Sequence, residues 1–182
     1  MSSGKNKKNH IGKCLVNATP KKVELLARES GLGKRDARMI AQACAAAYGS
    51  DFESVKIGCV LANKNVILSM DCNEAKSDPM QKELNIRYRG FRYPARFSIY
   101  EHSMHAETSA IKDVPYPIAQ DTDWKRVKAY VFRLAPGLPL GQGLAKPCPA
   151  CMHALMERGI RYVVYSTETG FATADLLVAT QF

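Results

Sequence analysis

The chain has 182 residues, of which 46% are hydrophobic and 24% are charged. This length suits a single domain with a substantial core, and this composition excludes a largely disordered protein. No apolar run approaches the roughly 18 residues that a membrane-spanning helix needs, and no apolar segment of the kind found in export signals follows the basic N-terminus. We therefore expect a cytoplasmic protein that does not enter a membrane.

The formal net charge of +9 is concentrated near the N-terminus. Six lysines and no acidic residue fall within the first 22 positions, which leaves a net charge of only +3 on the rest of the chain. We predict that residues 1–18 form a flexible basic arm and that residues 19–182 form a single domain. Such an arm can contact nucleic acid, although short Lys-rich arms are more often simply solvated.

Six cysteines are present, an even number that could indicate disulfides. The chain is long for a disulfide-stabilised scaffold, however, and it has no secretory segment. Only Cys148 and Cys151 have the spacing of metal ligands. We expect the other four to be small buried side chains.

The first part of the chain predicts two helices followed by a β-hairpin. Thr19 and Pro20 are typical of a helix start, with Thr as the N-cap. Apolar residues at helical spacing predict a second helix over 34–48. Two β-rich stretches, 55–61 and 66–72, flank a turn of Asn and Lys residues and predict the hairpin.

Residues 73–101 show no clear period, so we predict a long loop, a feature that is often functional. Helices are then predicted over 103–113 and 149–159, and strands over 128–134 and 161–166.

The last residues of the chain restrict how the final strand can be placed. Only 15 residues follow Thr167, which is too few for a crossover of about a dozen residues plus a parallel strand. A tight turn at 169–170 and an antiparallel strand over 171–178 fit this length. A helix over 172–179 is the alternative.

Two short motifs carry the candidate chemistry. His105-Ala106-Glu107 opens one predicted helix, and a Pro-Cys-Pro-Ala-Cys segment containing Cys148 and Cys151 opens another. The cysteine spacing places both sulfurs on one face of a helix, whose positive N-terminus favours thiolates. With His105 they make three ligands for Zn²⁺, and the fourth tetrahedral position stays open, as in catalytic zinc sites.

Glu107 supplies what such a site still lacks, a proton carrier. Zinc lowers the pKa of a bound water to about 7, which provides hydroxide at neutral pH. Glu107 can take the proton from that water, deliver it to a ring nitrogen and later protonate departing ammonia. His-x-Glu followed by Pro-Cys-x-x-Cys is the established signature of zinc deaminases.

A structural zinc site is the alternative interpretation of these motifs. Its fourth ligand would have to come from His102 or His153. His102 could also bind a second metal, although a partly exposed or capping role is more typical of a histidine in its position.

On these motifs and the order of its predicted elements, the chain from residue 34 to 182 resembles the cytidine deaminase-like superfamily. The resemblance implies a three-layer α/β/α sandwich around a mixed five-stranded sheet. It also implies substrate contacts at Asn73, Ala106 and Pro147, although Asn73 could simply end a strand. Within the superfamily, an antiparallel last strand resembles the free cytidine deaminases, whereas polynucleotide-editing and deoxycytidylate deaminases usually have a parallel one.

Residues 76–101 interleave arginines, including Arg89 and Arg92, with tyrosines and phenylalanines. Arginines can clamp a phosphate and aromatic rings can stack on a base, so Arg89 and Arg92 are candidate substrate contacts. The alternative is a surface loop pinned by buried aromatic residues, with its arginines solvated.

These observations favour a zinc-dependent hydrolase that releases ammonia from a pyrimidine, cytosine-type nucleoside or nucleotide. One alternative is a deaminase of single-stranded DNA or RNA, for which the basic arm and the arginine-rich segment argue. Another is a zinc-stabilised binding module without catalysis. The expected partner is the small-molecule substrate, and the resemblance is compatible with a homo-oligomer.

Overall fold

The computed structural model describes residues 18–89 and 102–179. The predicted basic arm, apart from its last residue, lies outside this part of the chain, and so does Arg92. Among the described helices, none combines the length and apolar character that crossing a membrane requires.

A mixed β-sheet forms the middle layer, with strand order β2-β1-β5-β7-β8 and a short strand β6 that pairs with β5. Its strands are β1 (Lys56–Asn63), β2 (Val66–Cys72), β5 (Val127–Leu134), β6 (Gln142–Gly143), β7 (Tyr162–Ser166) and β8 (Phe171–Asp175). The expected mixed sheet in an α/β sandwich is therefore confirmed, with β6 as an addition to the five strands.

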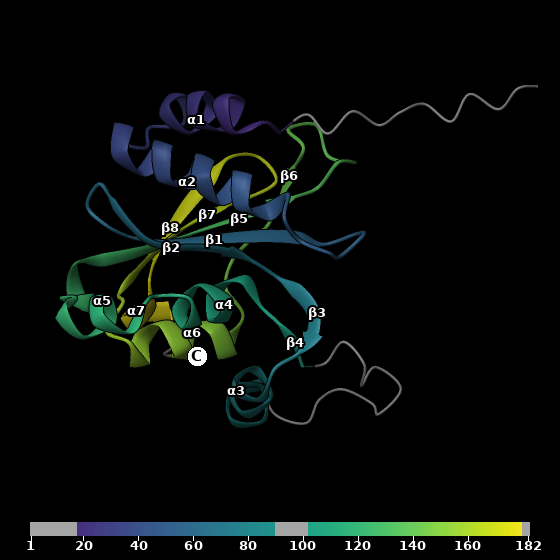
Figure 1. Cartoon of the computed structure of the whole chain (residues 1–182). Coiled ribbons are helices and arrows are strands. Elements are labelled where there is room, and N and C mark those ends of the chain that lie inside the picture. The colour runs from purple at the N-terminus through teal and green to yellow at the C-terminus, as the bar shows by residue number, and fades with distance from the viewer. Residues whose placement is uncertain (1–17, 90–101, 180–182) are drawn as a thin grey trace, which may run out of the picture.

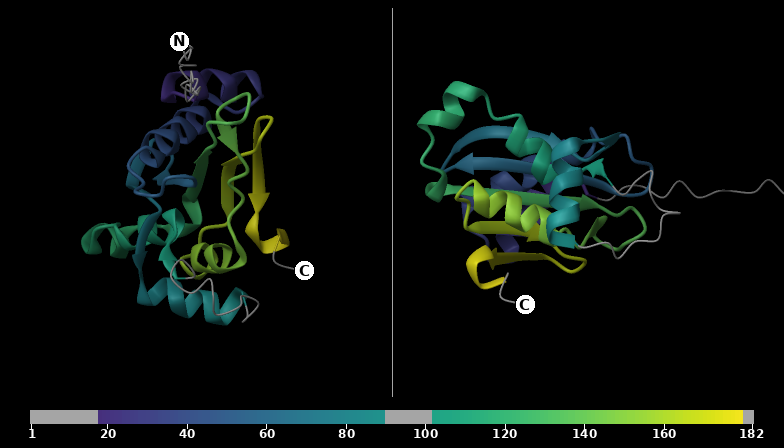
Figure 2. Two further views of the ribbon diagram at one scale, coloured as in Figure 1. Left: turned by 90° about the vertical axis from the view of Figure 1, so that its right-hand side faces the viewer. Right: turned by 90° about the horizontal axis from the view of Figure 1, so that it is seen from below.

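Helices cover both faces of this sheet (Figure 1). One face carries α1 (Pro20–Glu29) and α2 (Lys34–Ala47). The other carries α3 (Pro79–Arg89), α4 (Ala106–Lys112), α5 (Tyr116–Asp121), α6 (Pro149–Glu157) and α7 (Leu176–Ala179). Two views show α3 on the outside of α4 and α6, away from the sheet (Figures 1 and 2).

The apolar residues of β1 explain how the sheet holds two helical layers. Val60 and Ala62 pack with α2, whereas Cys59 and Leu61 pack with α4 and α6. Because alternate residues serve opposite faces, a strand buried on both sides has a continuous apolar run. At Gly58 the backbone of α2 comes so close that an added Cβ would lie 2.1 Å from the carbonyl oxygen of Ala43.

The strand directions confirm that the last strand runs antiparallel to its neighbour in the sheet. β1 is antiparallel to β2 and β5, and β5 is parallel to β7. β8 returns antiparallel to β7, with Ser166 opposite Phe171. The short helix α7 follows immediately, so each of the two alternatives for the C-terminal segment holds for part of it.

The long loop predicted for 73–101 is wrong in its described part. β3 (Glu74–Ser77) and α3 occupy it, and β3 pairs with β4 (Ser103–Met104). Two of the three buried residues of α3 are the polar Gln81 and Asn85, so the helix lacks the apolar period by which it could be recognised.

Two further boundaries differ from the predictions. The helix expected from 103 begins only at Ala106, because Ser103 and Met104 form β4 instead. A short helix, α5, occupies a segment for which no element was predicted, with Pro115 as its N-cap and a second proline in its first turn. Proline suits this first turn because its missing N–H would have no partner there.

Candidate metal centre and adjoining pocket

Two helix starts on the same face of the sheet bring the motif residues together. His105 is the N-cap residue of α4, and Glu107 lies in the first turn of that helix. Cys148 is the N-cap residue of α6, Pro149 occupies its first turn, and Cys151 follows within the same turn. Residues 43 to 46 apart in the sequence thus meet across the gap between two helix N-termini.

The three potential ligands converge on one point. The Nδ1 atom of His105 lies 3.2 Å from the sulfur of Cys151 and 3.6 Å from the sulfur of Cys148. All three donor atoms lie within 4.8 Å of one another. Zinc bond lengths in a tetrahedral site would separate nitrogen and sulfur ligands by about 3.6 Å. The donor atoms and their spacing are therefore compatible with Zn²⁺, and thiolate with imidazole is a ligand set that zinc favours.

The pKa values of the two cysteine thiols shift in opposite directions. A hydrogen bond from Cys151, aided by the His105 imidazole, lowers the pKa of Cys148 to about 4. That hydrogen bond, together with burial, raises the pKa of Cys151 well above its usual value. Burial alone would lower the pKa of His105, but its contact with Cys148 raises it. Metal binding therefore has to displace protons from this cluster.

Glu107 is only 5% exposed. Burial raises the pKa of its carboxyl group, although the nearby His105 opposes this effect. A carboxyl group with a raised pKa exchanges protons more readily near neutral pH, which is the requirement for a general acid and base.

A pocket of about 270 Å³ adjoins this cluster. His105, Ala106, Glu107 and Cys148 belong to its wall, and β1 and β5 contribute apolar side chains. The remaining lining residues are Phe52, Val55, Ile57, Asn73, Ser103, Met104, Val131, Leu144, Ala145 and Lys146. A small molecule in this pocket would therefore meet apolar walls and a few polar groups, as in most ligand sites.

Asn73 lines this pocket with an amide group that is already fixed. Its oxygen accepts a hydrogen bond from the backbone N–H of Ile57 at 2.7 Å, and its nitrogen donates to the carbonyl oxygen of Val55 at 2.8 Å. A primary amide can make up to four hydrogen bonds, so Asn73 retains donor and acceptor capacity. It can thus hold the start of β1 and still contact a ligand.

The other predicted substrate contacts differ in position. Ala106 lies in the pocket wall, whereas Pro147 is buried between two wall residues without lining the pocket itself. Arg89, at the end of α3, is also outside the wall, and its guanidinium donates to the side chain of Asn85 at 3.4 Å.

Sequence patterns missed several residues of the wall, among them Lys146, Phe52 and Leu144. Lys146 directly precedes the Pro-Cys-x-x-Cys motif, and that position was the available signal for it. Phe52 and Leu144 come from segments without a period, so only the folded chain brings them to the pocket.

Neither of the histidines considered as a fourth ligand belongs to the cluster formed by the described residues. The ring of His153 stacks on Tyr88, with 3.8 Å between the ring centroids. His102 is half-buried, and its Nδ1 atom has no hydrogen-bond partner among the described residues. The cluster therefore offers three protein ligands, the number typical of catalytic zinc sites.

The comparison with known families agrees with this geometry. A comparison with curated proteins gave no significant match. The family model described as the cytidine and deoxycytidylate deaminase zinc-binding region matches residues 34–167, which include both motifs, the sheet up to β7 and the helices from α2 to α6. The chain belongs to this family of zinc-dependent deaminases.

Proposed function

We propose that the protein is a zinc-dependent hydrolytic deaminase of a pyrimidine, cytosine-type nucleoside or nucleotide. The observation that carries this proposal is the position of Glu107, a buried carboxyl group in the wall of a small pocket, beside three convergent ligands. His105, Cys148 and Cys151 are the proposed zinc ligands, and Glu107 is the proposed catalytic acid and base.

Zinc, when bound, supplies a hydroxide nucleophile at neutral pH. Glu107 then has two tasks, because deamination needs one proton at the ring nitrogen and another at the departing amino group. Its raised pKa suits both transfers. Ile57, Met104 and Val131 present apolar surface that excludes bulk water from the reacting atoms. Asn73 is positioned to orient the sugar or base without a change of its own conformation.

The size of the pocket supports a single nucleoside or nucleotide as substrate. About 270 Å³ lies just below the range of roughly 300–1,000 Å³ that drug-sized ligand pockets occupy. The antiparallel β8 is a further resemblance to deaminases of free cytidine. Lys146 is an exposed cation in the wall, and a lysine ammonium is a suitable contact for a 5′-phosphate.

A substrate panel tests this proposal. The zinc-loaded full chain is incubated with cytidine, deoxycytidine, their 5′-monophosphates and a cytosine-containing single-stranded oligonucleotide, and products are identified by mass spectrometry with ammonia release. We expect turnover of at least one free nucleoside or nucleotide. Glu107→Gln is the matched control, because it removes the proton carrier and leaves the three ligands.

Glu107→Gln should bind zinc as the wild type does and turn over at least about 100-fold more slowly. Conversion of the oligonucleotide alone would support a polynucleotide deaminase instead. Full function in Glu107→Gln would favour the non-catalytic binding module.

A further inference from the structure

Helix α3 contacts both helices that carry the proposed zinc ligands. Its Tyr88 ring stacks on His153 of α6, and the Tyr88 hydroxyl donates to Glu157 of α6 at 2.6 Å. On the other side, Asp78, directly before α3, pairs with Lys112 of α4. The helix therefore spans the outer side of the two-helix layer that holds the cluster (Figure 2).

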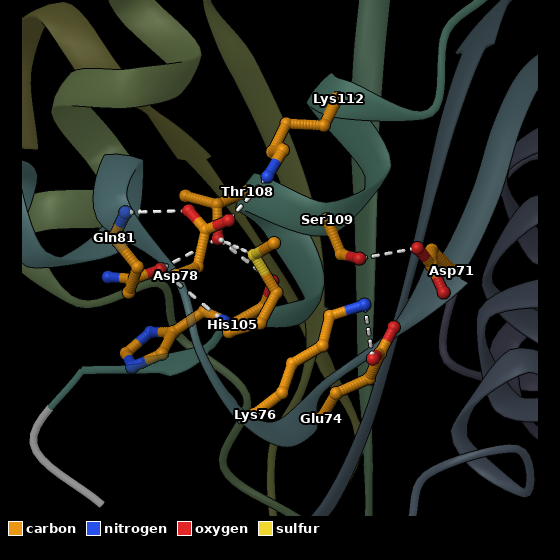
Figure 3. A network of polar contacts seen from close by, with 10 residues as sticks. Asp71, Glu74, Lys76, Asp78, Gln81, His105, Thr108, Ser109 and Lys112 are labelled. Atoms are coloured by element: carbon orange, nitrogen blue, oxygen red, sulfur yellow. Dashed lines mark hydrogen bonds and ion pairs between the residues drawn. The ribbon is translucent and has the colours of Figure 1, made fainter.

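Gln81 is the point at which α3 reaches the cluster itself. Its side chain is fully buried, with 0% exposed. Its Oε1 atom accepts hydrogen bonds from the backbone N–H of His105 at 3.3 Å and from the hydroxyl of Thr108 at 2.6 Å (Figure 3). One side-chain oxygen thus contacts the backbone of a proposed ligand and the first turn of α4.

The second half of the Gln81 amide holds the oxygen in that position. Its Nε2 atom donates to the side chain of Asn85 at 3.0 Å, one turn further along α3. The backbone N–H of Gln81 donates to the side-chain carboxylate of Asp78 at 3.0 Å, so the start of α3 is capped as well. Both ends of the amide have partners, and a buried amide satisfied at both ends has one favoured orientation.

The backbone N–H of His105 lies at a helix start. His105 is the N-cap residue of α4, so its N–H has no acceptor within that helix. A helix N-terminus leaves donors without partners inside the helix, and burial without a partner is costly. Gln81 supplies that acceptor from another element, so it fixes the backbone on which the imidazole is mounted.

We propose that Gln81 is a positioning residue for the metal site: it orients the His105 backbone so that Nδ1 faces the two thiols. This inference rests on the proposed ligand set, although not on the identity of the substrate. Outer partners of metal ligands typically contribute a factor of about 10–100 in metal affinity, and the Gln81–His105 contact has the same geometric task.

Cobalt binding to the full chain tests this inference. Co²⁺ is titrated into the metal-free protein against a chelator, and its d–d and thiolate charge-transfer bands report the coordination. Gln81→Met keeps the shape and removes the acceptor; we expect about 10-fold or more weaker Co²⁺ binding and altered bands. Gln81→Asn, which withdraws the oxygen by one methylene, should shift both readouts in the same direction and covers the case that Gln81→Met does not fold.

Two controls separate positioning from general destabilisation. Gln81→Glu, protonated by burial, keeps an oxygen for His105 and a donor for Asn85, so it should retain Co²⁺ affinity within about threefold and the wild-type bands. Asp78→Asn weakens the link to Lys112 and leaves the Gln81–His105 contact, so it should lower the melting temperature without altering the bands.

Wild-type bands and affinity in Gln81→Met and Gln81→Asn would overturn the inference, as would an equal loss in Asp78→Asn. If the wild-type chain itself bound no Co²⁺ through thiolates, the proposed ligand set would fail, which is a different result.

Discussion

The two faces of the sheet are built from different kinds of buried residue. The face under α1 and α2 is packed with apolar side chains, many of them alanines of α2, together with larger ones such as Met39 and Phe132. The face under α4 and α6 holds an apolar cluster as well, but buried polar residues surround it. They are Ser69, Asn73, Asp78, Gln81, Asn85, Ser103, Glu107, Thr108 and Ser109.

We call the face under α1 and α2 the supporting face, and the face under α4 and α6 the chemical face. Buried polar groups cost stability unless each has a partner, so a protein gathers them where their chemistry is used. On the supporting face the polar residues Asp36, Lys128 and Tyr130 contact one another, and none of them lines the pocket. Substitutions on this face should change folding stability, whereas substitutions of chemical-face residues that line the pocket or contact the ligand cluster should change metal binding or turnover.

The largest stability effect is expected at Gly58, on the supporting face. In Gly58→Ala the new Cβ would meet backbone atoms of α2, 2.1 Å from the oxygen of Ala43 and 2.4 Å from the nitrogen of Ala47. Backbone atoms cannot rotate away as a side chain can, so we expect the free energy of unfolding to fall by about 3 kcal/mol or more. Urea denaturation measures this change.

Gly137→Ala is the matched control, because an added Cβ at Gly137 meets nothing within 4 Å. Its free energy of unfolding should stay within about 0.5 kcal/mol of the wild type. Equal stability of Gly58→Ala and Gly137→Ala would show that α2 is not held at the distance seen here.

Asp36 provides a smaller, pH-dependent test of the supporting face. Burial would raise the pKa of Asp36, but hydrogen bonds from Tyr130 and Lys128 bring it below the usual 3.8. A carboxylate with a lowered pKa stabilises the fold above its unfolded pKa and loses this effect as the pH falls through the folded pKa. Asp36→Asn should therefore lower the free energy of unfolding by about 1–2 kcal/mol at pH 7, and the difference should shrink as the pH falls below 3.8 and through the lowered pKa of the folded state.

Urea midpoints at several pH values, with zinc affinity measured in parallel, check this prediction. Zinc affinity should not change, because Asp36 is on the opposite face of the sheet. A constant stability difference at all pH values would contradict the assigned role of the Asp36 charge, and weaker zinc binding would break the separation between the faces.

The smallest effect is expected at Lys146, on the chemical face. If its ammonium contacts a substrate phosphate, Lys146→Ala should raise the KM for a nucleoside 5′-monophosphate about 10-fold and leave the KM for the nucleoside unchanged, since a charge-assisted hydrogen bond contributes about 1.5 kcal/mol. The melting temperature should not move. Lys22→Ala, an exposed lysine of α1, is the control. Equal KM changes for both substrates would remove Lys146 from phosphate recognition.

The sequence allowed the supporting face and the motifs to be predicted better than the pocket. The hairpin of β1 and β2 and the helix α2 have local apolar periods, and the ligand motifs depend on short spacings at helix starts. Helix α3 was not predicted because its buried side carries the polar Gln81 and Asn85, and polar residues at these positions are typical of a loop. Phe52 and Leu144 reach the pocket through the tertiary fold alone, and no local pattern encodes that.

The glycine in β1 also has a consequence for the comparison of homologues. With no side chain at position 58, the separation between the sheet and α2 is as small as backbone contact allows. A relative with alanine or a larger residue there has to carry this helix farther out, and bulkier residues must then replace the alanines that face it. We therefore expect position 58 to covary with Ala43, Ala46 and Ala47. The residue at position 58 in a homologue should then indicate how far α2 lies from the sheet.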